Sequence, residues 1–178
     1  MKNALNYLGF QLGWYACVAG ASRGQVWVGP LLVAALLWVH LRWIVEPKQR
    51  KRELRLVLGV LLIGMLADSA LQALGATRYP SSQEAWGYLL PPPWIGALWI
   101  LFGTLLRHSL AWLAPRLWLA CLLGAVGGPL SYLGGVGMGA VAVGDSAPWT
   151  YGWLGLEYAL LTPLLLLLGA RASSSDAA

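Results

Sequence analysis

The sequence predicts an all-α membrane protein, a polytopic bundle of six transmembrane helices with both termini in the cytoplasm. Hydrophobic residues make up 58% of the 178 residues and charged residues only 11%, whereas a soluble domain carries about a quarter charged residues. The chain also holds 11 Trp, 22 Gly and 10 Pro, which are frequent in membrane helices and at their interfaces. This composition argues against a soluble enzyme, a disordered chain and a fibrous repeat.

Six apolar segments follow one another, and each can cross the hydrocarbon layer of roughly 30 Å as a helix. Backbone groups find no water in lipid and no segment alternates like a barrel strand, so helices are expected. The segments cover residues 4–21, 26–45, 53–75, 93–107, 116–143 and 149–170. Residues 1–171 thus form a single transmembrane domain, and the tail 172–178 is predicted to be disordered.

The first segment allows two interpretations. Lys2 precedes an apolar run that ends in small residues at 19–22, as in a cleaved signal peptide. Asn6, Gln11 and Trp14 interrupt this run, and the apolar core of a signal peptide is normally simpler. These interruptions favour a retained first helix over a cleaved one.

The orientation follows from basic residues between the second and third segments, namely Arg42, Lys48, Arg50, Lys51, Arg52 and Arg55. Such a basic connection is typical of a cytoplasmic loop. It places both termini inside, together with the loop that contains Arg107 and Arg116. This topology accounts for the formal charge of +5, so membrane lipids rather than nucleic acid are the expected partners.

The outer connection 76–93 contains Tyr79, Trp86 and Tyr88 before a triple proline. An aromatic belt at the headgroup level is favoured here over a lid or a short interfacial helix.

Pro129 lies inside the fifth segment among several glycines. Proline lacks the amide donor for the carbonyl of Ala125, and glycine weakens a helix further. The sequence leaves open whether this helix is broken, as in transporters, or continuous.

Glycines four residues apart, such as Gly9 and Gly13 or Gly124 and Gly128, predict close helix packing within the bundle. Contact with a second copy or another membrane protein is the alternative.

Two carboxylates, Asp68 and Glu157, lie inside predicted spans, where a charge costs about 2.5–3.5 kcal/mol on insertion scales. At helical rise, Asp68 is about 10 Å and Glu157 about 12 Å from the outer ends of their helices. They therefore share a depth in the outer half of the bilayer. We expect them to act as an acid/base or ligand-binding pair; the alternative is that they are buried polar groups that join helices.

Other polar and aromatic residues are expected to orient a ligand in a pocket that opens toward the outer leaflet or the outside. Gln72 is four residues after Asp68 and shares its helix face. The full set of candidates is Gln11, Trp14, Gln72, Trp99, Ser131 and Tyr132.

No metal and no cofactor is predicted. His40 and His108 stand beside arginines at cytoplasmic helix ends, where snorkelling toward the interface explains them. Cys17 and Cys121 are isolated in apolar segments and form neither a metal spacing nor a disulfide framework. The sequence also lacks a Walker loop, a dinucleotide fingerprint, a zincin helix and a serine elbow, and whether the protein is an enzyme is left open.

Several stretches, taken together and in this order, resemble a known family: Asn6-Tyr7, Phe10-Gln11 and Trp14, then Asp68, then Pro93-Trp94, Leu98-Trp99 and Phe102, then Gly124-Ala125 and Gly128-Pro129-Leu130-Ser131-Tyr132. The set resembles domain of unknown function 2878, a family of small bacterial proteins. The resemblance covers nearly the whole chain. It implies a multi-pass protein of the bacterial cytoplasmic (inner) membrane without an assigned activity, and it favours a function that involves lipids.

Three functions fit these observations. The leading one is an integral membrane protein that binds or modifies a lipid or another apolar ligand in the outer half of the bilayer. The second is a small proton-coupled transporter in which Asp68 and Glu157 carry protons. The third is a non-enzymatic scaffold or accessory subunit that holds a partner through its glycine faces.

Overall fold

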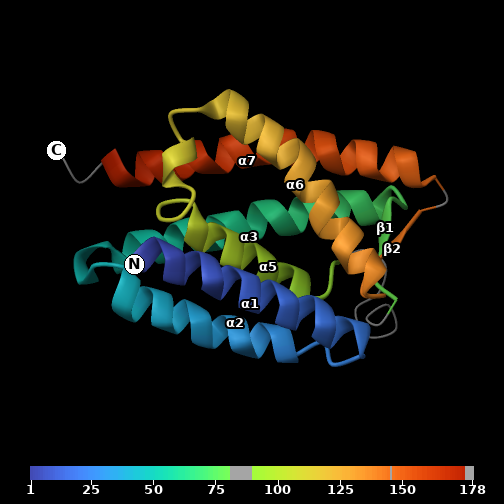
Figure 1. The fold of residues 1–178 in the computed structure, drawn as a ribbon, viewed down its shortest axis with the longest axis horizontal. Helices are drawn as coiled ribbons and strands as arrows, with labels where there is room; N and C mark the ends of the chain where they lie inside the picture. The colour runs from blue at the N-terminus through green and yellow to red at the C-terminus, as the bar shows by residue number, and fades with distance from the viewer. Residues whose placement is uncertain (81–89, 145, 175–178) are drawn as a thin grey trace.

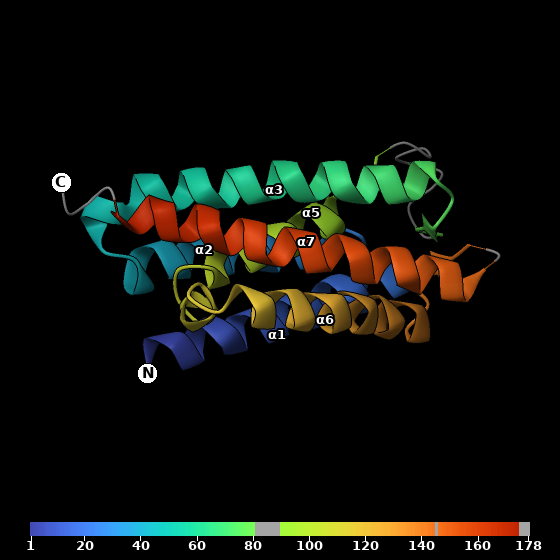
Figure 2. The same cartoon turned by 90° about the horizontal axis from the view of Figure 1, so that it is seen from above.

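The computed structural model describes residues 1–80, 90–144 and 146–174 of the chain. Within these residues, six long helices lie side by side, and each runs opposite to the one before it, so both termini lie at the same end of the bundle (Figures 1 and 2). The helices are α1 (Lys2–Ser22), α2 (Val28–Val39), α3 (Arg50–Ala73), α5 (Pro93–Leu105), α6 (Leu117–Gly137) and α7 (Ala147–Ser174).

Short elements complete the connections. A π-helical turn at His40–Ile44 extends α2, and 3₁₀ turns at Pro47–Gln49 and Ala111–Leu113 precede α3 and α6. Strands β1 (Thr77–Arg78) and β2 (Ala142–Val143) pair antiparallel, with Thr77 opposite Val143. This pair joins the connection after α3 to the connection after α6 at the end of the bundle far from the termini (Figure 1).

The helical class of the prediction is confirmed, but most helix ends differ from the predicted bounds. α6 ends at Gly137 instead of residue 143, because Gly139 has a φ of +79° and turns the chain into β2. α3 begins three residues early, at Arg50. α7 continues to Ser174, so residues 172–174 of the predicted disordered tail are helical, and 175–178 lie outside the described residues.

The sequence left open whether the helix breaks at Pro129, and the structure shows that it does not. α6 runs through Pro129 as one helix, just as α7 runs through Pro163. Gly155 of α7 lies against the carbonyl of Ala125, which loses its usual donor to the proline, and a Cβ at Gly155 would be 3.2 Å from this oxygen. Tight packing of α7 on α6 therefore supports the helix where its own hydrogen bonding is weakest.

The outer surface of the bundle has the apolar character of a membrane protein. In the part of the chain that the structure describes, three helical stretches are long and apolar enough to cross a bilayer: Pro47–Ala73, Leu117–Gly137 and Ala147–Ala172. The apolar stretches Val28–Ile44 and Pro93–Leu105 are shorter. Large side chains such as Leu66 and Trp118, each more than 70% exposed, cover this surface, as a lipid environment favours.

Several of the glycines contact other helices of the same chain. Gly13 of α1 faces Leu101 of α5, and Gly124 and Gly128 of α6 face the backbone and ring of Tyr158 in α7. These faces are thus used in packing within the bundle. A homo-oligomer or another membrane partner remains a prediction.

Candidate ligand-binding cavity

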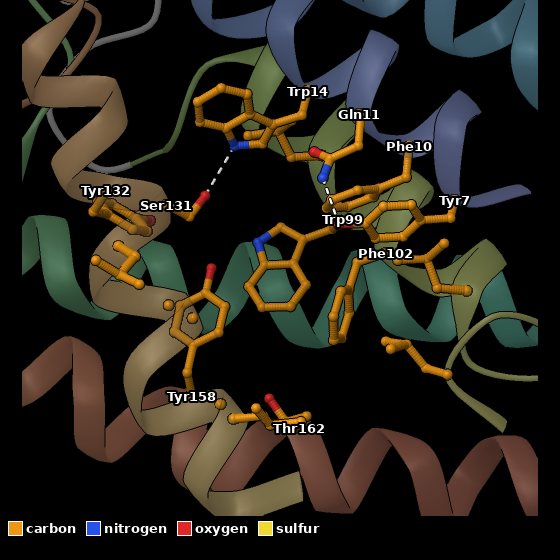
Figure 3. Close-up of a pocket in the computed structure, with 18 of the residues that line it drawn as sticks. Tyr7, Phe10, Gln11, Trp14, Trp99, Phe102, Ser131, Tyr132, Tyr158 and Thr162 are labelled. Carbon is orange, nitrogen blue, oxygen red and sulfur yellow. Dashed lines mark hydrogen bonds between the residues drawn. The ribbon is translucent and has the colours of Figure 1, made fainter. Parts of the chain in front are cut away.

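A cavity of about 580 Å³ lies among α1, α5, α6 and α7. Its wall is mostly aliphatic and aromatic, and the aromatic side chains come from all four helices (Figure 3). Asp68 of α3 contributes the carboxylate of this wall. A cavity of this size with few polar groups is typical of a site for a small apolar molecule.

Trp99 forms the centre of the wall. Its ring stacks on Tyr158 with centroids 5.6 Å apart and planes 18° apart, and it meets the edge of Phe102 at 5.9 Å. On its other side the ring packs on Gly64 of α3, where any Cβ would collide with it. The glycine in α3 thus allows the indole to lie between the helices in one fixed position.

Two hydrogen bonds hold the α1 side of the cavity (Figure 3). Trp14 Nε1 donates to Ser131 Oγ at 2.9 Å, which connects α1 to α6. Gln11 Nε2 donates to the hydroxyl of Tyr7 at 2.7 Å, one turn away on the same helix. Each donor is therefore satisfied inside a largely apolar wall.

Asp68 accepts three hydrogen bonds in the interior. Its Oδ2 accepts from Trp99 Nε1 at 2.6 Å, and its Oδ1 accepts from the hydroxyls of Tyr132 and, at 3.5 Å, Tyr79. Asp68 as a whole is 1% exposed. Asp68 thereby joins α3, α5, α6 and the β1 connection, and it also contributes to the cavity wall.

Tyr79 was not among the predicted site residues. The sequence placed it in an aromatic belt, but it is 1% exposed and packs edge-on against Trp94 at 5.6 Å. Burial, followed by the nearby charges of Asp68 and Glu157, raises its pKa well above the ordinary value of 10.0, so its hydroxyl stays protonated and can donate. The aromatic belt is therefore wrong for Tyr79; Trp86 and Tyr88 lie outside the described residues.

The structure brings most, but not all, of the predicted site residues together. Those that line the cavity are Gln11, Trp14, Asp68, Trp99, Ser131 and Tyr132. Gln72 is buried but is not part of the cavity wall. Glu157 is also outside the wall, and its two carboxyl oxygens are buried without a hydrogen-bond partner among the described residues.

A second polar cluster lies where α2, α3 and α5 end or begin. Glu53 is fully buried; His40 Nε2 lies 2.9 Å and His108 Nε2 3.3 Å from its Oε1, and Arg107 Nη1 lies 2.9 Å from its Oε2. Snorkelling is therefore the wrong explanation for His40, which is 3% exposed. The sequence alone does not mark Glu53 as a buried residue, because a glutamate in the first turn of a helix resembles an ordinary interfacial residue.

The donor atoms of His40, Glu53 and His108 lie within 4.8 Å of one another, close enough to surround a metal ion. The hydrogen bonds of Asn6 favour another interpretation. Its Oδ1 accepts from Ser109 Oγ at 2.6 Å, so its amide group points to Nδ1 of His40 at 3.4 Å. Nδ1 then accepts, and Nε2 carries the hydrogen and donates to Glu53. The nitrogen that would bind a metal is thus already a donor, and the cluster is best described as a buried ion-pair network.

The all-helical fold and its long apolar helices define a class, that of α-helical proteins with the character of membrane proteins. Within this class, the family model described as protein of unknown function (DUF2878) matches residues 3–164. The chain therefore belongs to the DUF2878 family. No curated protein and no solved structure matches the chain.

Proposed function

We propose that this protein is a multi-pass protein of the bacterial inner membrane that binds a lipid or another apolar molecule in the cavity between α1, α5, α6 and α7. The observation that carries this proposal is the cavity itself. Its volume of about 580 Å³ falls within the usual range for small-molecule sites, and its wall is aromatic and aliphatic with a few placed polar groups.

The arrangement of the helices supports six spans with both termini inside. The alternating helices bring both termini to one end of the bundle (Figure 1), and the basic residues from Arg42 to Arg55 follow α2 or begin α3 at this same end. Positive residues favour the cytoplasmic side. In this orientation Asp68 lies toward the outer half of the bilayer.

Ligand binding is favoured over acid/base catalysis. Asp68 already accepts three hydrogen bonds, which leaves it suited to orienting a ligand rather than to transferring a proton. Glu157 is outside the cavity wall, so the two carboxylates do not both face the space where a substrate would lie. The continuous α6 also lacks the broken helix on which a hinge for transport would depend.

The proposal can be tested with N-phenyl-1-naphthylamine, a neutral apolar dye that fluoresces when it leaves water. We would measure energy transfer from tryptophan to this dye in the purified full-length protein in dodecyl maltoside. The informative variant is Gly127→Leu, because Gly127 lines the cavity and a Cβ there meets only open space. A leucine at this position would take up space at the cavity wall, and we expect affinity about tenfold weaker than for the wild type.

The matched control is Gly59→Leu on α3, which is also in open space but does not line the cavity. It should bind the dye like the wild type. Equal binding in all three proteins would show that the dye occupies another place, and the proposal would then fail.

A further inference from the structure

We infer that the cavity selects apolar molecules that carry a positive charge. This inference rests on the proposed function and specifies the chemistry of its ligand. Three features of the cavity support it: the charge of the wall, the hydrogen bonds around that charge, and the aromatic faces that surround the space.

The charge of the wall is negative. Among the described residues, Asp68 is the one carboxylate on the cavity wall, and no Lys, Arg or His lines it. Arg107, by contrast, is paired with Glu53 in the second cluster. A carboxylate without a basic neighbour in a cavity of low dielectric attracts a cation and repels an anion.

The hydrogen bonds around Asp68 suit its ionised form. The indole of Trp99 can only donate, and the hydroxyl of Tyr132 also donates to the carboxylate. A carboxylate that accepts from both of its oxygens needs no proton of its own. The donors stabilise the charge of Asp68 but do not neutralise it. A cationic ligand would compensate the negative charge that the wall retains.

Aromatic rings make up much of the remaining wall. Tyr7, Phe10, Trp14, Phe102 and Tyr158 all line the cavity (Figure 3). The face of an aromatic ring is negative and attracts a cation within about 6 Å of its centroid, most strongly where water is excluded. Rings from α1, α5 and α7 can therefore contact one cationic group from several sides, while its apolar substituents contact the aliphatic wall.

Tetraphenylphosphonium and tetraphenylborate test this inference, because the two ions share size and shape and differ in sign. Each would displace N-phenyl-1-naphthylamine from the purified wild-type protein, with concentrations corrected for partition into protein-free micelles. We expect the phosphonium ion to displace the dye at concentrations about tenfold lower than the borate. Equal displacement, or stronger displacement by the borate, would overturn the inference while leaving the proposed function intact.

Two variants locate the preference. Asp68→Asn should bring the two ions close to equal potency, and its helical circular dichroism spectrum and melting temperature check that the variant folds. Phe102→Leu keeps Asp68 and removes one aromatic face, so it should weaken the binding of the phosphonium ion by more than it weakens the binding of the borate. If the dye does not bind the wild type at all, the proposed function itself fails. If Phe102→Leu weakens the binding of both ions equally and Asp68→Asn still prefers the phosphonium ion, the charge and the rings do not select the ligand.

Discussion

The indole nitrogen of Trp99 lies 2.6 Å from Oδ2 of Asp68. This hydrogen bond joins α5 to α3 in the interior, and both residues are at most 3% exposed. A charge that is costly in a membrane is thus stabilised by donors from neighbouring helices.

Trp99→Phe removes the donor but keeps an aromatic ring. Hydrogen bonds to charged groups are worth about 1.5–3 kcal/mol, so we expect the free energy of unfolding to fall by about 2 kcal/mol. Denaturant titration in mixed micelles measures this change. The control is Trp118→Phe, at a 71% exposed position, which should stay within about 0.5 kcal/mol of the wild type.

Gly64→Ala places a methyl group where the Trp99 ring lies. The two cannot occupy the same space, so the ring must move, and overpacking of this kind costs about 1–3 kcal/mol. Gly59→Ala, at the other glycine, in the first half of α3, meets open space and should be neutral or slightly stabilising. Equal melting temperatures for the two variants would contradict the packing described for Trp99.

Glu53→Gln leaves Arg107 and His40 without their carboxylate partner. Breaking a buried ion pair from one side costs about 3–5 kcal/mol, and we expect a loss near the lower end because Arg107 keeps its contact with Gln49 at 3.0 Å. The exposed Glu46 provides the comparison, since Glu46→Gln should change the stability by less than about 0.5 kcal/mol. A small effect at Glu53 would mean that the network contributes little to the fold.

The ionisation of Tyr79 makes the stability of the protein depend on pH in the alkaline range. Its pKa is raised in the folded protein, whereas an unfolded tyrosine ionises near about 10. The folded state therefore holds a proton that the unfolded state loses, and stability falls as the pH rises above about 10. Between pH 8 and 11, Tyr79→Phe should lose less stability than the wild type, as measured by thermal unfolding at each pH. The same loss in both proteins would place the titrating groups elsewhere.

Long apolar runs and their turn residues were enough to predict the helical class, and the depth of Asp68 marked it as an unusual buried acid. Tyr79 could not be predicted, because its position depends on the pairing of β1 with β2, two segments far apart in the sequence. The state of Pro129 was left open for a similar reason. The missing backbone donor of Pro129 does weaken the helix, but the sequence does not show that Gly155 of α7 packs against it at this point.

The contact between Glu53 and His40 could not be predicted from the sequence either. Each stands where a helix begins or ends, a place where charged residues are common. Their mutual contact and the hydrogen bond from Asn6 depend on how three helices meet. The spacing of residues along one helix does not show which residues of other helices they will contact.

The hydrogen bond between Trp14 and Ser131 has a consequence for access. α1 packs closely on α2 and α5, and α6 packs closely on α7, whereas α1 and α6 are not a closely packed pair. Among the described residues, the neutral hydrogen bond, worth about 0.5–1.5 kcal/mol, and the contact of the Trp14 ring with Gly134 connect the two helices across this seam. In the proposed membrane orientation this seam would face the acyl chains, so a molecule dissolved among them would reach the cavity from the side without passing through water.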